Sequence, residues 1–154
     1  MKSAKNNIEI KNCFALVEIL IVLGIFSILA LIGIPAFKMY QSDLQLSGSL
    51  RELSIDLRYA GQLAITEQID YGVVFFPDDH QYQIVIFGDS NEILKSKTLP
   101  QGISFLSITG FTNNEVVFNP YGAAKEQGII TLINTKQATG SVDVRPSGFI
   151  KIIK

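Results

Sequence analysis

A run of nineteen residues without a single charge, from Ile19 to Phe37, constrains this chain more than any other feature. Together with the residues from Phe14 onward, it reaches the length of about 20 residues that a helix needs to cross a bilayer. A secretory signal peptide has a shorter apolar region, of roughly 7–15 residues, and a small-residue cleavage site, for which Pro35-Ala36-Phe37-Lys38 is a poor match. A helix buried in a soluble core is the third interpretation. Length and uniformity favour the membrane-spanning helix.

The charges around this run predict its orientation and restrict the partners of the chain. Basic residues ahead of a span favour a cytoplasmic N-terminus, so the C-terminal part is expected to face outward, on the other side of the membrane. The residues that carry this argument are Lys2, Lys5 and Lys11, with Glu9 as the only acid among them. Without those four, the totals of 13 basic and 14 acidic residues become 10 and 13. A net charge of −3 from Phe14 onward gives no general attraction to nucleic acid.

One acid, Glu18, interrupts the apolar stretch. An ionised carboxylate at the centre of a bilayer costs about 3 kcal/mol on insertion scales, and such residues usually mark a functional site. The alternative is that Glu18 lies near the membrane surface and extends its carboxylate to water. Position alone leaves both interpretations open.

Beyond the apolar run, apolar residues continue at helical spacing. Steps of four and three place them on one face of an amphipathic helix from about Phe37 to Glu67. The face consists of Leu46, Leu50, Leu53, Leu57, Ala60 and Ala64. Joined to the apolar run, this segment predicts one long helix, with Arg51, Glu52, Asp56 and Arg58 away from the apolar face.

From Tyr71 onward, short β-type runs alternate with turn residues. The predicted strands are 71–76, 82–87, 93–99, 103–108, 115–118, 128–133, 141–145 and 149–153. Asp78-Asp79-His80 and Gly88-Asp89-Ser90-Asn91 are predicted turns. One long helix followed by antiparallel strands is an α+β pattern, in which the amphipathic half packs on an antiparallel β-sheet domain.

The N-terminal sequence resembles the class III signal of type IV prepilins. That signal has a short basic leader, a small residue, an aromatic residue after the cut, Leu-Val-Glu and about twenty apolar residues. Here the corresponding residues run from Cys13 and Phe14 through Ala15-Leu16-Val17-Glu18. Pro35 stands at the twenty-second position from Phe14, where many pilins carry a helix-bending proline. The resemblance departs from the family in having Cys13 where glycine is usual and Ala15 where threonine is common.

The resemblance implies a processing and assembly pathway. A prepilin peptidase would cut between Cys13 and Phe14 and methylate the new amine of Phe14. Glu18 would neutralise that amine, within its own subunit or a neighbour, as helices stack into a filament. A carboxylate four residues along a helix is within reach of such an amine, and pairing offsets the cost of burying it.

The C-terminal half resembles the GspH/FimT group of pseudopilins. The residues that carry this are Val117-Phe118-Asn119-Pro120-Tyr121-Gly122, Gly128-Ile129-Ile130-Thr131-Leu132, Val142-Asp143-Val144 and Gly148-Phe149-Ile150-Lys151-Ile152. Relatives that act in DNA uptake carry arginines in the closing strand, where this chain has Phe149 and Lys151. Lys151 and Lys154 are therefore the candidates for a weak DNA contact, and nucleic acid is the less favoured partner because bidentate guanidinium contacts are missing.

Enzyme and metal motifs are missing from the sequence. It has one cysteine and one histidine and contains no nucleophile elbow, zinc-protease motif or phosphate-binding loop. Asp78, Asp79 and Asp89 could converge on a calcium ion across a hairpin, but solvated turn charges are the favoured interpretation. No enzyme, cofactor or metal centre is predicted, and no intramolecular disulfide can form.

The sequence therefore predicts a leader at 1–13, a transmembrane and assembly helix at 14–37 and a periplasmic α+β pseudopilin domain at 38–154. Its expected partners are other pilin or pseudopilin subunits, prepilin peptidase and the inner membrane. The predicted function is that of a structural minor pseudopilin in a type II secretion or type IV pilus filament. A DNA-binding minor pilin is the first alternative. A membrane-anchored binding module, left uncut because of Cys13, is the second.

Overall fold

The structure, a computed structural model, describes residues 5–88 and 91–153. Side chains are described from residue 15 onward within these ranges, except at positions 36, 38 and 39. The chain divides into two compact units, Met1–Tyr40 and Gln41–Lys154. One 63-residue helix, α1 (Lys5–Glu67), contributes to both units.

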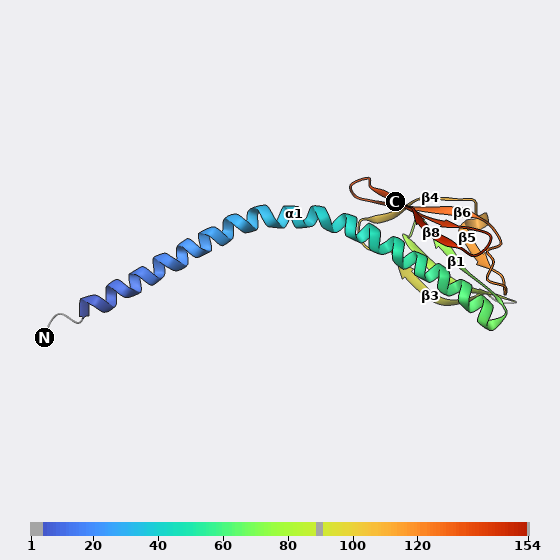
Figure 1. Cartoon of the computed structure of the whole chain (residues 1–154), viewed down its shortest axis with the longest axis horizontal. Helices are drawn as coiled ribbons and strands as arrows, with labels where there is room; N and C mark the ends of the chain where they lie inside the picture. Colours follow the sequence, from blue (N-terminus) through green and yellow to red (C-terminus); the bar gives the residue numbers. More distant parts are fainter. Residues whose placement is uncertain (1–4, 89–90, 154) are drawn as a thin grey trace. The chain divides into compact units, whose positions relative to one another are not determined.

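In the second unit, α1 is amphipathic as its sequence predicts. Its six-residue apolar face from Leu46 to Ala64 is buried, and these side chains form the core together with strand residues such as Val73 and Ile130. Figure 1 shows the strands of the sheets beside this half of α1. The helix ends where Gln68 adopts a left-handed backbone conformation, with φ of 57°, and its side-chain amide donates to the carbonyl of Ile65 at 2.7 Å.

The strands form two four-stranded sheets, in which every pairing is antiparallel. The first sheet has the order β3-β2-β1-β5, and the second has the order β4-β6-β7-β8. The first contains β1 (Asp70–Phe76), β2 (Gln81–Phe87), β3 (Glu92–Thr98) and β5 (Glu115–Phe118). The second contains β4 (Ile103–Thr109), β6 (Gly128–Asn134), β7 (Thr139–Val144) and β8 (Ile150–Ile153). A short 3-10 helix, η1 (Thr112–Asn114), precedes β5.

Both sheets contact the same helix. Leu50 lies so close to Gly140 of β7 that a Cβ at that glycine would clash with it. One turn after Leu57, Gly61 faces the ring of Phe118 in β5, with 3.5 Å between a Cβ built at the glycine and the ring. The helix therefore fills the space that the inward faces of the two sheets leave, and its glycine allows the close approach of an aromatic ring.

The fold confirms the α+β prediction and the long helix on antiparallel strands. All eight predicted strands are present, and their observed ends differ from the predicted ends by at most two residues. The division of the strands between two sheets is not contained in that prediction, because it depends on β4 pairing with β6 while β5 joins β1. Local alternation encodes a strand, but it does not encode which distant strand completes its hydrogen bonds.

Candidate assembly interface

The first unit contains a helical segment, Ala15–Pro35, that is long and apolar enough to cross a membrane. None of it is buried in the structure, and its large aliphatic and aromatic side chains are exposed. Leu, Ile and Ala form helices well, and this segment has no complementary apolar surface within its own unit on which to pack. A 21-residue apolar helix without cover needs hydrocarbon or other helices as its surroundings.

Two polar interruptions lie within this segment. Ser27 donates its hydroxyl to the carbonyl of Leu23 at 2.8 Å, so its polar group is satisfied inside the helix. Pro35 lies inside α1, and because proline has no amide hydrogen, the carbonyl of Leu31 loses its helical donor there. Pro35 is thus at the position that the sequence assigned to a helix-bending proline, and its role in assembly stays a prediction.

Glu18 is the only charged residue between Ala15 and Pro35, and it is exposed. No hydrogen bond or ion pair joins it to any residue that the structure describes. The side chains of Cys13 and Phe14 lie outside the described residues, as does any contact that they make with Glu18. Within the described part, Glu18 is a carboxylate on an apolar rod that has no partner in its own chain.

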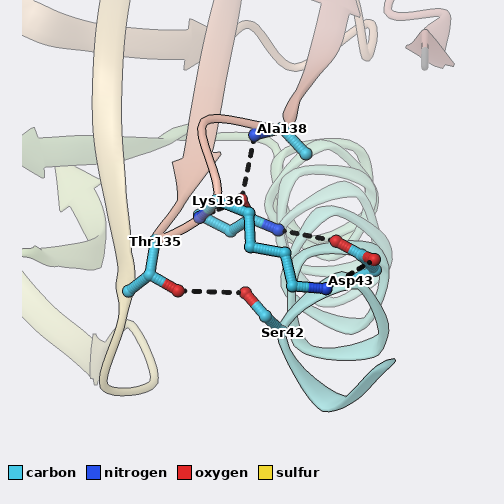
Figure 2. Close-up of polar contacts among 6 residues, drawn as sticks. Ser42, Asp43, Thr135, Lys136 and Ala138 are labelled. Carbon is cyan, nitrogen blue, oxygen red and sulfur yellow. Dashed lines mark hydrogen bonds and ion pairs between the residues drawn. The ribbon is translucent and has the colours of Figure 1, made fainter. Parts of the chain in front are cut away.

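In the second unit, the turn between β6 and β7 holds the start of the buried half of the helix (Figure 2). The Asn134 amide nitrogen donates to Asp43 Oδ1 at 2.9 Å, and the ammonium of Lys136 lies 3.1 Å from Asp43 Oδ2. The hydroxyls of Ser42 and Thr135 lie 3.2 Å apart. We call these five residues the helix clamp. The hydrogen bonds from Lys136 and Asn134 hold the pKa of the Asp43 carboxyl below its usual value.

Asn134 organises the turn as well as the clamp. Its side chain is 3% exposed, and Oδ1 accepts the backbone N–H groups of Lys136 and Ala138, each at 2.9 Å. The amide oxygen of Asn134 therefore holds the turn, while its amide nitrogen holds Asp43 of α1. An Asx-type turn of this kind is expected for asparagine, but its second contact with Asp43, 91 residues away, is not predictable from local sequence.

Asp56 forms a second polar contact between the helix and the strands. Only 4% of Asp56 is exposed, and its Oδ2 accepts the Tyr82 hydroxyl at 2.7 Å and lies 2.8 Å from Lys97 Nζ. Lys97 also pairs with Glu52, one helical turn before Asp56. The periodicity assigned Asp56 to the polar side of the helix, whereas the structure buries it. The ion pair makes this tolerable, because a buried carboxylate needs a charged or hydrogen-bonding partner.

The structure describes only part of the other candidate sites from the sequence. Asp78, Asp79 and His80 are exposed in the turn between β1 and β2, and the described residues contain no cluster suited to a metal ion. Asp89 lies outside the described residues. Lys151 is exposed on β8 and pairs in register with Asp143, whose carboxylate is 3.3 Å from Arg145. Lys154 lies outside the described residues, so the DNA contact of Lys151 and Lys154 stays a prediction.

Comparisons with known proteins show which family this chain belongs to and which solved structures share its fold. The family of type II transport protein GspH matches residues 49–148, which cover the C-terminal part of α1 and the seven strands from β1 to β7, and end before β8. No curated protein matches the sequence. Residues 49–148 are more than half of the chain, which establishes the family.

Two solved structures share the fold. The minor pseudopilin EpsH from the type II secretion system of Vibrio cholerae has a TM-score of 0.62 and 13% identity, covering 71% of this chain and 96% of that one. The type IV minor pilin FimU of Pseudomonas aeruginosa has a TM-score of 0.63 and 11% identity, covering 75% of this chain and 92% of that one. Both are structural subunits and not enzymes. The long helix, the two antiparallel sheets and the matched segment together identify this chain as a member of the GspH family of pilin-like proteins.

Proposed function

We propose that this chain is a structural minor pseudopilin of a type II secretion or type IV pilus filament. It is first inserted in the inner membrane, is then processed by prepilin peptidase and is finally assembled into the filament. The observation that carries the proposal is the exposed apolar segment Ala15–Pro35, attached to a folded domain of the GspH family. Such a segment serves two purposes, because the same surface that lies in lipid before assembly packs on other helices afterwards.

Processing removes residues 1–13 on the cytoplasmic side. The peptidase cuts between Cys13 and Phe14, and the new amine of Phe14 is methylated. The resemblance to prepilin signals supports this step, as do the basic residues that precede the span. Cysteine is small enough to occupy the position before the cut, although glycine would fit more easily.

Assembly depends on the carboxylate of Glu18, which has no partner among the residues that the structure describes. The cut creates a positive charge at Phe14, four residues before Glu18, where a helix brings side chains to one face. Pairing with an amine removes the cost of holding an isolated carboxylate among apolar helices. Glu18 thereby favours the packed state over a state in which the rod lies alone in hydrocarbon.

The experiment compares Glu18→Ala with Ser27→Ala in a host that carries a filament assembly system and prepilin peptidase. Ser27 is the matched control because it is a second polar group on the same exposed segment, satisfied within the helix. Both variants are expected to insert in the membrane and to be cut. Glu18→Ala is expected to fall at least about tenfold in the sheared filament fraction, because breaking a buried ion pair costs several kcal/mol.

Two outcomes would count against the proposal. Equal incorporation of wild type and Glu18→Ala into filaments would show that Glu18 has no role in assembly. Absence of the wild-type chain from filaments, despite its insertion in the membrane, would contradict the filament function and favour the membrane-anchored binding module.

A further inference from the structure

The sheet of β3, β2, β1 and β5 has a second apolar face, which is directed away from the core. Directly opposite residues of antiparallel strands share a face, and Val117, Gly72, Val85 and Ile93 are opposite one another across the four strands. The residues on either side of Gly72 belong to the core, so these four lie on the other face. We call them the outer row. Val85 is only 5% exposed although it is outside the core, whereas Ile93 on the edge strand is 57% exposed.

A small recess lies at the β5 end of the outer row. The ring of Phe87 lies against Gly72, where a Cβ would come within 2.9 Å of it. Phe87 and Val117 form the apolar wall of a recess of about 160 Å³. An engineered cavity of about 150 Å³ takes up one benzene-sized group, whereas sites for small molecules and cofactors begin at about 300 Å³. The recess therefore has room for one side chain and is too small for a cofactor.

Two carboxylates line the recess beside the apolar wall. Glu126 accepts the backbone N–H of Thr112 at 2.6 Å and its hydroxyl at 2.7 Å, so its orientation is fixed. No hydrogen bond or ion pair joins Glu115 to any residue that the structure describes. Lys125 also lines the recess, but its ammonium lies 2.6 Å from Asp70 and is already paired. These three acids and one base give the recess and its border a net charge of −2.

A cationic side chain with an apolar stem matches this arrangement of groups. Two acids repel an anion, and the described residues contain no group of three acids or histidines suited to a metal ion. Each carboxylate oxygen accepts more than one hydrogen bond, so the bonds from Thr112 leave further acceptor sites on Glu126. Arginine suits two carboxylates better than lysine, because its planar guanidinium presents five donors and stacks on an aromatic ring such as Phe87.

We propose that the recess binds an arginine side chain of a protein partner, whose adjacent aliphatic residues lie on the outer row. The guanidinium contacts Glu115 and Glu126, and the apolar stem of the arginine packs on Phe87 and Val117. A few residues carry most of the binding energy of a protein interface, and arginine is enriched among them. The inference goes beyond the proposed function, because it concerns a surface of the folded domain and requires neither the apolar segment nor its cleavage.

Binding is tested by adding three short peptides to the full chain in detergent micelles. The first peptide is acetyl-Gly-Val-Arg-Val-Gly-amide, and the other two carry citrulline or lysine in place of arginine. Citrulline has nearly the shape of arginine but no charge. The NMR signals of valine and isoleucine methyl groups locate the peptide, because Val117 and Ile93 are expected to shift. Ile133, on the second sheet, is expected not to shift.

The affinities of the three peptides measure the recognition of charge and shape. The arginine peptide is expected to bind about tenfold more tightly than the citrulline peptide, because hydrogen bonds between ionised groups are stronger than those of a neutral donor. The lysine peptide is expected to bind less tightly than the arginine peptide, because an ammonium cannot bridge two carboxylates with a planar fork.

Variants of the chain separate the acid from the apolar row. Glu115→Gln removes the charge and keeps the size, and it is expected to lower the affinity for the arginine peptide about fivefold while leaving the citrulline peptide unchanged. Glu92→Gln is the matched control, because this exposed glutamate of β3 pairs in register with Ile86 and so lies on the other face of the sheet. Ile93→Thr is expected to weaken all three peptides by a similar factor of about three, because each loses the same apolar contact.

Several results would overturn the inference. They are equal affinities for the arginine peptide and either of the other two, an arginine-peptide affinity that Glu115→Gln leaves unchanged, and no binding of any peptide up to its solubility limit. A shift of the Val117 methyl signals on raising the chain concentration without peptide would show that a second copy covers the outer row, which also contradicts the proposal. None of these results bears on the filament function, which Glu18→Ala tests, and a chain that never enters filaments can still bind the arginine peptide.

Discussion

At the scale of single residues, the buried carboxylate of Asp56 is the most sensitive polar group of the domain. Burial raises its pKa, but the hydrogen bonds from Lys97 and Tyr82 and the charges of Lys97 and Lys95 outweigh burial and lower it. Burial, followed by the neighbouring Asp56 carboxylate, raises the pKa of Tyr82. The phenol is thus a hydrogen-bond donor and the carboxylate an acceptor at neutral pH.

The lowered pKa of Asp56 fixes the sign of a pH effect. The group is more acidic in the folded state than in the unfolded chain, so its contribution to the free energy of unfolding is present above the unfolded pKa of about 3.9. That contribution is lost as pH falls through the lower, folded pKa. Acid therefore weakens the link between α1 and strands β2 and β3 at pH values below about 4.

Asp56→Asn is expected to lower the free energy of unfolding by about 1–3 kcal/mol at neutral pH, because it removes the buried charge that Lys97 and the Tyr82 hydroxyl contact and leaves Lys97 with Glu52 alone. The loss should shrink as the pH is lowered toward 3, where the wild type loses the same contribution. Urea unfolding of the full chain in detergent, followed by tyrosine fluorescence, measures both. Asp79→Asn, at an exposed turn, is the control and should change little. An equal loss at both pH values would contradict this explanation.

At the scale of elements, the helix and strands were predictable and their partners were not. The steps of Leu46 to Ala64 predict which helix face is buried, because burial follows local periodicity. The pairing of β5 with β1 rather than with β4 depends on contacts between residues more than 40 positions apart, to which no local pattern refers. Asp43 with Asn134 and Asp56 with Tyr82 were missed for the same reason. The sequence indicates only that an acid can accept a hydrogen bond from an amide or a phenol.

The helix clamp is expected to stabilise the start of the buried half of α1. Asn134→Asp keeps the acceptor for the two turn N–H groups but replaces the donor to Asp43 with a second carboxylate. Repulsion between the two acids is expected to lower the free energy of unfolding by about 1–3 kcal/mol at pH 7. Hydrogen exchange at residues 41–47 should increase at the same time, since the clamp holds that turn.

Exchanging the two residue types between positions 43 and 134 tests the same contact. Asp43→Asn combined with Asn134→Asp again places one amide against one carboxylate, and it should recover most of the lost stability and protection. Both are measured by urea unfolding and by hydrogen exchange with mass spectrometry on the full chain in detergent. If the double variant is as unstable as the sum of the two single variants, the Asp43–Asn134 contact does not hold the helix.

At the scale of the whole molecule, two compact units carry different chemistry. The second unit buries an apolar core of its own and joins its helix to its strands through the helix clamp and the Asp56 contacts. The first offers an exposed apolar rod with one carboxylate that has no described partner. This division suits a subunit that must remain folded while its rod exchanges lipid for other helices.

Processing at Phe14 is tested by the intact mass of the chain after co-expression with prepilin peptidase, with Cys13→Gly in parallel. The expected product begins at Phe14 and carries one added methyl group, with a larger cut fraction for Cys13→Gly because glycine is smaller. If both proteins keep residues 1–13 and carry no methyl group, then Phe14 never supplies an amine to Glu18, and the chain is not processed as a pilin.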